Sequence, residues 1–316
     1  MSNEKIECLL PYEFIKNKLH GKDFTLAEIR AGIGKQVYKI NTASDIFMLY
    51  LWCKPYEGTL TENMTKGNEY LWRDGYDCFL NNTKLLVDIG IKVPEIINTG
   101  HYEVNYAIVE FLHGKDIGEY QENGGNIKNI SEKITEMMNK MDNHTRSWYG
   151  SPLTDKANDI SSEQLMFDYY SHELEMAAEI DEQVKELQPS IQQVITNHFK
   201  NIDVGIKEKY GLVHGELTPP HIFILDNGEI ALVDIEGLKY FDKEFDWAVL
   251  EMMYDGEIIL PNDINRERLD FYKLCLKIGY ISVAVDYLKN VDNTHEFFRG
   301  LYIENLDYIK ELIKST

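Results

Sequence analysis

Three carboxylates and one imidazole occur in one short stretch of this sequence, at spacings that suit phosphoryl transfer. Glu216 comes five residues before His221, and Asp234 and Glu236 follow after an apolar stretch. If the chain folds back on itself there, these four side chains surround one small volume. Carboxylates at that density repel each other unless a cation lies among them, and their hard oxygen atoms favour Mg²⁺. We therefore expect a divalent metal ion to bind at this place.

Local signals in the sequence indicate how the four side chains come together. Pro219 and Pro220 lack amide donors and force an extended path, so residues 216–221 are expected to form a loop rather than a helix. The apolar runs 222–225 and 230–233 are joined by Asp-Asn-Gly, which is typical of a β-hairpin. Because a hairpin brings its two ends together, it places the loop beside the acids that follow.

This stretch resembles the catalytic core of the aminoglycoside phosphotransferase and choline kinase-like family. The family pattern is H-G-D-L-x-x-x-N followed by I-D-[FW]-x-[DEG]. The chain reads H-G-E-L-x-x-x-H over residues 214–221 and V-D-I-E-G over residues 233–237. Residues 240–248 resemble the family's Y-G-D-P-x-x-D-L-A and keep both aspartates, Asp242 and Asp246. The spacing between the motifs is also similar, so the resemblance extends over the whole stretch.

The resemblance implies a role for each polar side chain of the stretch. Glu216 stands where the family has its catalytic aspartate and would orient or deprotonate the acceptor hydroxyl. His214 would brace the loop, while Asp234 and His221 stand at metal positions. Because Mg²⁺ prefers oxygen to an imidazole, His221 makes Mn²⁺ the alternative to Mg²⁺. Glu236 is a candidate on the substrate side.

The first third of the chain carries further motifs of the family in the expected order. Gly32 and Gly34, followed by Lys35, fit a glycine turn between two strands, where small residues let the backbone approach nucleotide phosphates closely. The run Y-A-I-V-E-F-L-H-G is similar to the family's segment between the lobes, whose backbone holds the adenine edge. The resemblance implies that Glu110 and Leu112 bind the base, and that ATP or GTP is the phosphoryl donor.

One family position has changed in the strand after the glycine turn. The phosphate-binding lysine expected there is replaced by Tyr50, which leaves Lys35, Lys39 or Lys54 as possible substitutes. A helix is expected over residues 69–89, because a glycine suited to end it follows. The acid that would pair with the lysine stays open among three residues of this helix, Glu69, Asp74 and Asp77.

The resemblance implies a two-lobed protein kinase-like fold of the α+β class, with a small β-rich N-lobe and a larger, mainly helical C-lobe. We place the nucleotide-binding lobe at residues 1–110 and the catalytic and substrate-binding lobe at residues 111–316. Residues 165–199 are expected to form two acidic helices broken near Pro189. Members of the family use such a helical insert for the acceptor, and the candidate contacts here are Asp168, His172, Glu173 and Glu175.

Charge and composition narrow the classes of partner. The chain of 316 residues has a net charge of −21, of which −18 falls after residue 110. An acidic second lobe disfavours nucleic acid, whose binding depends on basic side chains, and would attract a small cation. The four cysteines are far apart in the sequence and form no C-x-x-C pair, so neither a zinc cluster nor a disulfide framework is indicated. Without a membrane-length apolar run or a secretory signal, we expect a cytoplasmic protein that does not bind membranes.

Two functions from different classes fit the sequence. The first is a small-molecule phosphotransferase that moves the γ-phosphoryl group of ATP or GTP to a hydroxyl of an aminoglycoside-like or choline-like acceptor. The second is a catalytically impaired pseudokinase that binds a nucleotide or another ligand, which the changes at Tyr50, Glu216 and His221 favour. Glutamate in place of aspartate moves the carboxylate by about 1.5 Å, and a misplacement near 1 Å can cost about 100-fold in rate. A metal-dependent hydrolase lacks the H-E-x-x-H type of ligand spacing.

Overall fold

The computed structural model describes residues 10, 12–31, 35–52, 75–155, 158–254 and 257–315, although the side chains of residues 30 and 31 are not described. The described residues fall into two compact units. The first lies within Met1–Lys66, Trp72–Asn126 and Pro219–Leu238, and the second within Gly67–Leu71, Ile127–Thr218 and Lys239–Thr316. Residues 111–126 and 219–238 thus pack with the first unit. The lobe boundary expected from the sequence, at residue 110, places both segments in the second lobe.

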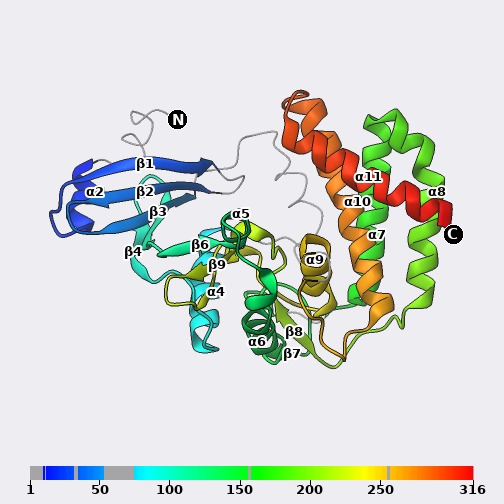
Figure 1. The fold of residues 1–316 in the computed structure, drawn as a ribbon, viewed down its shortest axis with the longest axis horizontal. Coiled ribbons are helices and arrows are strands. Elements are labelled where there is room, and N and C mark those ends of the chain that lie inside the picture. Colours follow the sequence, from blue (N-terminus) through cyan, green and yellow to red (C-terminus); the bar gives the residue numbers. More distant parts are fainter. Residues whose placement is uncertain are drawn as a thin grey trace. The chain divides into compact units, whose positions relative to one another are not determined.

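The first unit is built on a five-stranded antiparallel sheet. Its strands follow the order β1-β2-β3-β5-β4 and comprise β1 (Phe24–Ala31), β2 (Gln36–Thr42), β3 (Ile46–Trp52), β4 (Ile96–His101) and β5 (Asn105–Glu110) (Figure 1). Aromatic and β-branched side chains favour this conformation. In β2, the buried residues Gln36, Tyr38 and Ile40 alternate with half-buried ones. This period of two distinguishes the two faces of the sheet.

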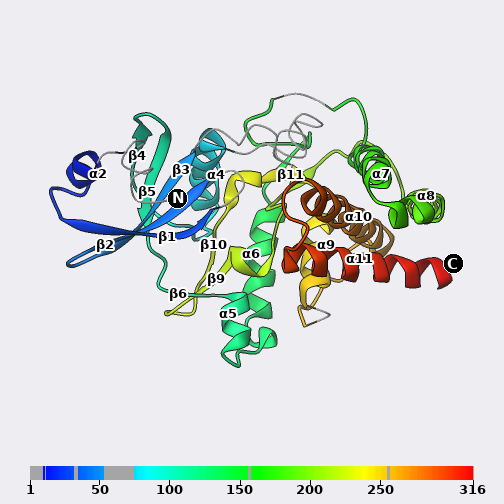
Figure 2. The ribbon, with the colours of Figure 1, turned by 90° about the horizontal axis from the view of Figure 1, so that it is seen from above.

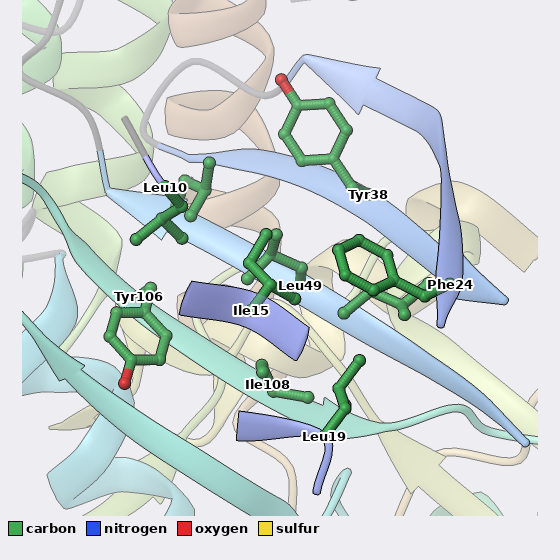
Figure 3. Packing of buried hydrophobic residues seen from close by; sticks show 10 residues of the cluster. Leu10, Ile15, Leu19, Phe24, Tyr38, Leu49, Tyr106 and Ile108 are labelled. Carbon is green, nitrogen blue, oxygen red and sulfur yellow. The ribbon is translucent and has the colours of Figure 1, made fainter. Parts of the chain in front are cut away.

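One face of the sheet packs against the short helix α2 (Tyr12–Lys18). Ile15 of α2 and Leu19 after it join a buried cluster with side chains from β1, β2, β3 and β5, including Phe24, Tyr38, Leu49 and Ile108. Figure 3 shows Ile15 and Leu19 lying among these strand residues. Full burial of such a side chain stabilises the fold by about 1.5–3 kcal/mol. This face therefore forms the core of the unit.

The opposite face of the sheet carries Tyr50 and Trp52 and packs against helix α4 (Tyr76–Asp88). The Phe79 ring of α4 lies 5.7 Å from the Tyr50 ring and 5.1 Å from the Trp52 ring, between centroids. The helix ends before Gly90, whose φ of 75° suits a glycine stop as the sequence predicts. Residues 69–74, where the helix was expected to begin, lie outside the described residues.

The predicted hairpin is confirmed. Strands β9 (Ile222–Leu225) and β10 (Ile230–Leu232) are antiparallel, and the turn between them contains Gly228 with a φ of 79°. The short strand β6 (Gly114–Asp116) pairs with β9 to complete a three-stranded sheet and leads into helix α5 (Ile117–Glu122). A Cβ atom on Gly114 would lie 2.3 Å from the carbonyl oxygen of Ile224, so β6 can approach β9 this closely only through a glycine. Single 3₁₀ turns precede and follow the hairpin: η2 (Pro219–His221) and η3 (Ile235–Gly237).

The second unit combines a small sheet with long helices. The sheet has the order β11-β8-β7, formed by β7 (Thr145–Arg146), β8 (Tyr210–Val213) and β11 (Lys239–Phe241). The helices are α6 (Ser131–Asp142), which follows the turn η1 (Ile127–Asn129), α7 (Ser162–Ile180), α8 (Glu182–Asn201), α9 (Glu244–Tyr254), α10 (Arg266–Asn290) and α11 (Glu296–Ser315). Helix α7 packs on α8 and α10, and α10 also packs on α9 and α11 (Figures 1 and 2). The α+β class, with a β-sheet N-terminal part and a helical C-terminal region, is as expected.

The break between α7 and α8 lies at Asp181, so the prediction of a break near Pro189 was wrong. Asp181 has an extended backbone, and its carboxylate caps α8 by accepting a hydrogen bond from Val184 N at 2.9 Å. Pro189 is exposed inside α8. Buried side chains on both sides of it, Val184 and Ile191 among them, hold the helix together despite the hydrogen bond that proline removes.

Among the residues that the structure describes, we find no helix that is both long enough and apolar enough to cross a membrane.

Candidate functional site

The end of the hairpin brings His221 and Asp234 together. The amide of Val233 donates to the carbonyl of His221 at 3.0 Å, which joins the two ends of the hairpin. His221 Nε2 lies 3.3 Å from Asp234 Oδ2. Asp234 has left-handed backbone angles, φ 59° and ψ 47°, which cost energy for a residue other than glycine. Such strain persists only where the surroundings fix it, and it is common at functional sites.

The Lys35 side chain lies between the two acids that follow the hairpin. Its ammonium is 2.7 Å from Asp234 Oδ1 and 2.6 Å from Glu236 Oε1. The Lys35 side chain is 12% exposed and that of Glu236 is 8% exposed, whereas the Asp234 side chain keeps 42% of its surface in solvent. Burial opposes the charge of Lys35, but Glu236 and Asp234 outweigh this effect and hold the lysine pKa above its ordinary value. Lys35 is therefore a permanent cation next to an accessible carboxylate.

Helix α4 fixes the turn that carries Glu236. The fully buried Asn82 donates from its side-chain amide to the carbonyl oxygens of Ile235 and Glu236, at 2.9 and 3.1 Å. Among the described residues, Glu236 Oε2 is buried and has no hydrogen-bond partner. The sequence placed Glu236 on the substrate side, and the structure places it beneath Lys35 with one orphaned oxygen. A buried carboxylate oxygen of this kind needs a partner, which a bound cation or its water would supply.

Tyr50 lies beside Lys35 on the sheet. Val37 of β2 is the register partner of Tyr50 of β3, and the Lys35 ammonium lies 5.0 Å from the centre of the Tyr50 ring. The tyrosine is 8% exposed, and burial raises the pKa of its hydroxyl to about 12 against the opposing effect of Lys35. Tyr50 is thus a neutral aromatic platform under the lysine.

The segment expected to hold the adenine edge follows the end of β5. The Glu110 carboxylate accepts hydrogen bonds from Lys92 Nζ at 2.6 Å and from Glu95 N at 3.1 Å. Burial opposes ionisation of Glu110, but the two hydrogen bonds and the charge of Lys92 together outweigh it and lower the carboxyl pKa. Leu112 is 7% exposed. Base binding by this segment stays a prediction, and Gly32 and Gly34 lie outside the described residues.

In the second unit, the backbone around Glu216 is held on one side by Asp246 of α9. The Asp246 carboxylate accepts from His214 N at 2.6 Å and from Gly215 N at 2.8 Å. Glu216 N in turn donates to His214 Nδ1 at 3.3 Å, and the histidine is fully buried. Glu216 itself is exposed. These contacts fix the main chain before and at Glu216 and leave its carboxylate accessible.

A buried lysine that the sequence analysis missed lies beside this segment. Lys239 of β11 is the register partner of Val213 and is 2% exposed. Burial lowers its pKa to about 8, while the charges of Asp246 and Glu216 act in the opposite direction. Burial also raises the pKa of Asp246 to about 6, against its two backbone hydrogen bonds and Lys239. The alternation of apolar and polar residues along a strand does not predict a buried lysine, because lysine side chains are almost always exposed.

Asp242, the other retained aspartate, belongs to a buried ionic network of the second unit. Its carboxylate accepts from Ser162 Oγ at 2.8 Å and from Lys207 and Tyr272. Lys207 also lies 2.8 Å from the fully buried Glu163. The network ties the end of β11 to the beginning of α7 and to α10, so Asp242 stabilises the fold of this unit.

Two of the acceptor-side candidates of α7, Asp168 and Glu173, have different surroundings. Asp168 is exposed and accepts from Gln164 Nε2 at 2.8 Å. Glu173 is half-buried and accepts from Ser282 Oγ of α10 at 2.6 Å. Glu173 thus joins two helices, and Asp168 remains accessible to a ligand.

Comparison with known sequence families shows the family to which this chain is similar. The sequence profile of the phosphotransferase enzyme family, APH, matches residues 69–259, which is more than half of the 316 residues. No curated protein matches the sequence.

Several solved structures share the fold over nearly their whole length. The apo structure of a thermostable mutant of aminoglycoside phosphotransferase APH(4)-Ia has a TM-score of 0.67 at 12% identity, over 96% of this chain and 98% of that one. Choline kinase LicA from Streptococcus pneumoniae has a TM-score of 0.61 at 13% identity, over 95% and 98%. Spectinomycin phosphotransferase APH(9)-Ia, in complex with ADP and spectinomycin, has a TM-score of 0.59 at 13% identity, over 98% and 92%. At these identities the likeness shows the fold alone.

Proposed function

Since this chain belongs to the phosphotransferase enzyme family, we propose that it transfers the γ-phosphoryl group of ATP or GTP to a hydroxyl of a small acceptor. The observation that carries the proposal is the arrangement after the hairpin in the first unit. There the accessible carboxylate of Asp234 lies 2.7 Å from Lys35 Nζ and 3.3 Å from His221 Nε2. A metal-bound polyphosphate carries positive charge on its metal ion and negative charge on its phosphates. A carboxylate and an imidazole suit the metal ion, and a fixed cation beside them suits the phosphates.

The donor atoms of this place fit a divalent cation. Asp234 offers a carboxylate oxygen, His221 offers a ring nitrogen, and the buried Glu236 Oε2 lacks a partner among the described residues. Mixed oxygen and nitrogen ligands suit Mn²⁺ better than Mg²⁺, which prefers oxygen alone. When bound, the metal would neutralise charge on the transferring phosphate. We assign Asp234 and His221 as the residues that hold it.

Glu216 is the acceptor-side base of the proposal. Its backbone is fixed through His214 and Asp246, while its carboxylate is exposed. In this position it would accept the proton of the acceptor hydroxyl as the oxygen attacks the γ-phosphorus, and the nucleoside diphosphate would leave. Positioned general bases contribute about 10²- to 10⁴-fold to rate.

A small cationic alcohol is the acceptor that the charge distribution supports. A net charge of −18 after residue 110 attracts cations by electrostatic focusing. Two of the structures similar to this one are named as an aminoglycoside phosphotransferase and a choline kinase. Asp168, exposed on α7, is available to pair with an ammonium group of such an acceptor.

The test begins with calorimetric titration of ATP and of GTP into the protein with Mg²⁺, with Mn²⁺ and with a chelator. Metal-dependent binding is expected for at least one nucleotide. A panel of aminoglycosides and choline-like alcohols then follows, with nucleoside diphosphate release as the readout and Glu216→Gln as the inactive control. The absence of nucleotide binding with either metal would contradict the proposal.

The alternative is a nucleotide-binding module without phosphoryl transfer. The ion pair between Lys35 and Asp234 favours it, because that contact occupies one oxygen of the metal-binding carboxylate. The same experiment separates the two functions. Nucleotide binding, with or without metal, that yields no product from any acceptor in either the unsubstituted protein or Glu216→Gln would favour the binding module.

A further inference from the structure

We propose that Lys35 supplies the cation that binds the nucleotide phosphates, so that this role has moved from the strand position of Tyr50 to the residue directly before β2. The inference rests on the proposed function and names a nucleotide-binding residue for it. It selects one lysine where the sequence leaves three candidates open.

The strand register explains how Lys35 reaches this position. Side chains alternate between the faces of a sheet, and Val37 of β2 is opposite Tyr50 of β3. Lys35 lies two residues before Val37 and therefore projects to the same face as Tyr50. The distance of 5.0 Å between the Lys35 ammonium and the Tyr50 ring centre agrees with this placement. A lysine before β2 thus reaches the volume above position 50 without a lysine in β3.

The surroundings of Lys35 hold its ammonium in one place. The Tyr50 ring lies to one side, while Asp234 and Glu236 accept at 2.7 and 2.6 Å. An ammonium has three N–H donors, and within the described part of the chain these two carboxylates use two of them. The side chain is 12% exposed, so its charge is confined rather than free to move in solvent. A confined cation beside the metal-binding carboxylate is positioned for a phosphate oxygen.

The orphaned oxygen of Glu236 is an independent observation at the same place. Glu236 is 7% exposed, and its Oε2 has no partner among the described residues. The same carboxylate holds Lys35 through Oε1. We infer that Glu236 anchors the lysine, while Asp234 exchanges its contact with Lys35 for the metal when the nucleotide binds.

The other lysines fit less well. Lys39 lies four residues farther along β2, about 13 Å at the usual rise per residue of a strand. Its ammonium is 4.5 Å from the centre of the Phe111 ring. Lys54 lies outside the described residues. Lys35 alone among the three has described contacts to both Asp234 and Glu236.

The experiment compares nucleotide affinity across four variants by calorimetric titration of Mn²⁺–ATP and Mg²⁺–ATP. Lys35→Met is expected to weaken binding about 10- to 100-fold, as the loss of a hydrogen bond to a charged group does. Lys22→Met removes an exposed lysine of the same unit and is expected to bind as the unsubstituted protein does. Lys39→Met tests the rival residue. The double variant Lys35→Met with Tyr50→Lys returns a lysine to β3 and is expected to recover at least part of the lost affinity.

Each outcome has a distinct meaning. Binding by the unsubstituted protein together with equal binding by Lys35→Met overturns the assignment of Lys35 and leaves the proposed function standing. A loss in Lys39→Met in place of Lys35→Met also overturns it. A double variant that folds, judged by circular dichroism, but stays as weak as Lys35→Met contradicts the link to position 50. No binding by the unsubstituted protein contradicts the proposed function itself.

Discussion

The ammonium of Lys35 lies 5.0 Å from the centre of the Tyr50 ring, on the sheet face that packs against α4. The relationship makes the loss of a lysine at position 50 compatible with a working nucleotide site. If no cation lay near Tyr50, the site would lack the positive charge that binds phosphate. Lys35 above the ring and the two carboxylates beside it supply the charges that the proposed nucleotide site requires.

Replacing the base should separate chemistry from binding. Glu216→Gln keeps the size of the side chain and removes its charge, so we expect turnover to fall by about 10²- to 10⁴-fold. The affinity for nucleotide should stay within about twofold, because Glu216 is assigned to the acceptor. Steady-state kinetics with calorimetry measure both, and the exposed Glu208→Gln serves as a matched control. Equal turnover in Glu216→Gln and Glu208→Gln would contradict the assignment.

His221 should determine which metal the site prefers. An imidazole ligand favours Mn²⁺ over Mg²⁺, and an amide oxygen at the same position removes this preference. We therefore expect His221→Asn to lower the ratio of Mn²⁺- to Mg²⁺-supported ATP binding. Calorimetric titrations with each metal measure this ratio. A ratio that does not change would show that His221 is not a ligand.

Lys239 should make the stability of the second unit depend on pH. Its pKa is about 8 in the folded protein against an ordinary 10.5, so the unfolded chain binds this proton more tightly. The free energy of unfolding therefore rises as the pH increases from 8 to 10.5, by about 1 kcal/mol per pH unit. Lys239→Met lacks this rise, so its stability relative to the unsubstituted protein should be highest below pH 8 and decline above it.

Urea unfolding at several pH values between 7 and 10 measures this difference. The exposed Lys200→Met is the control for the loss of one positive charge. If the difference between Lys239→Met and the unsubstituted protein were the same at every pH, Lys239 would not titrate in this range.

The ionic network around Asp242 should be sensitive to loss of its lysine. Lys207 pairs with Glu163 and Asp242, whose side chains are 0% and 2% exposed. Lys207→Met leaves both carboxylates buried with less compensation and should lower the free energy of unfolding by about 3 kcal/mol. Lys209→Met, at an exposed position nearby, should change it by about 0.5 kcal/mol or less. Urea unfolding at neutral pH compares the two, and equal stability would show that Lys207 contributes little.

The parts of the site that follow from local sequence could be predicted. Prolines and an Asn-Gly turn determine the hairpin through backbone preferences of a few residues, and the hairpin in turn brings His221 close to Asp234. The aspartate that caps α8 is a local signal of the same kind. The proline eight residues later is the stronger helix-breaking signal in the sequence, because it lacks an amide donor, but it lies inside α8.

The contacts between distant parts of the chain could not be predicted. Lys35 and Glu236 are 201 residues apart in the sequence, and their pairing depends on strand register and on the turn that Asn82 fixes. Burial of Lys239 depends on the packing of β11 in the second unit. A side chain's type and spacing do not reveal which distant element covers it.

The central claim is metal-dependent phosphoryl transfer. It is tested most directly by incubating ATP or GTP with the protein, Mn²⁺ or Mg²⁺ and hydroxyl-bearing cationic acceptors, removing the metal on a chelating resin, and recording phosphorus NMR of the products. We expect the γ-phosphate signal of at least one nucleotide to be replaced by the signals of a nucleoside diphosphate and of a phosphomonoester of one acceptor in equal amounts, and we expect Glu216→Gln to slow this conversion by about 10²- to 10⁴-fold. Nucleotide that binds but stays intact with every acceptor and both metals would contradict the claim.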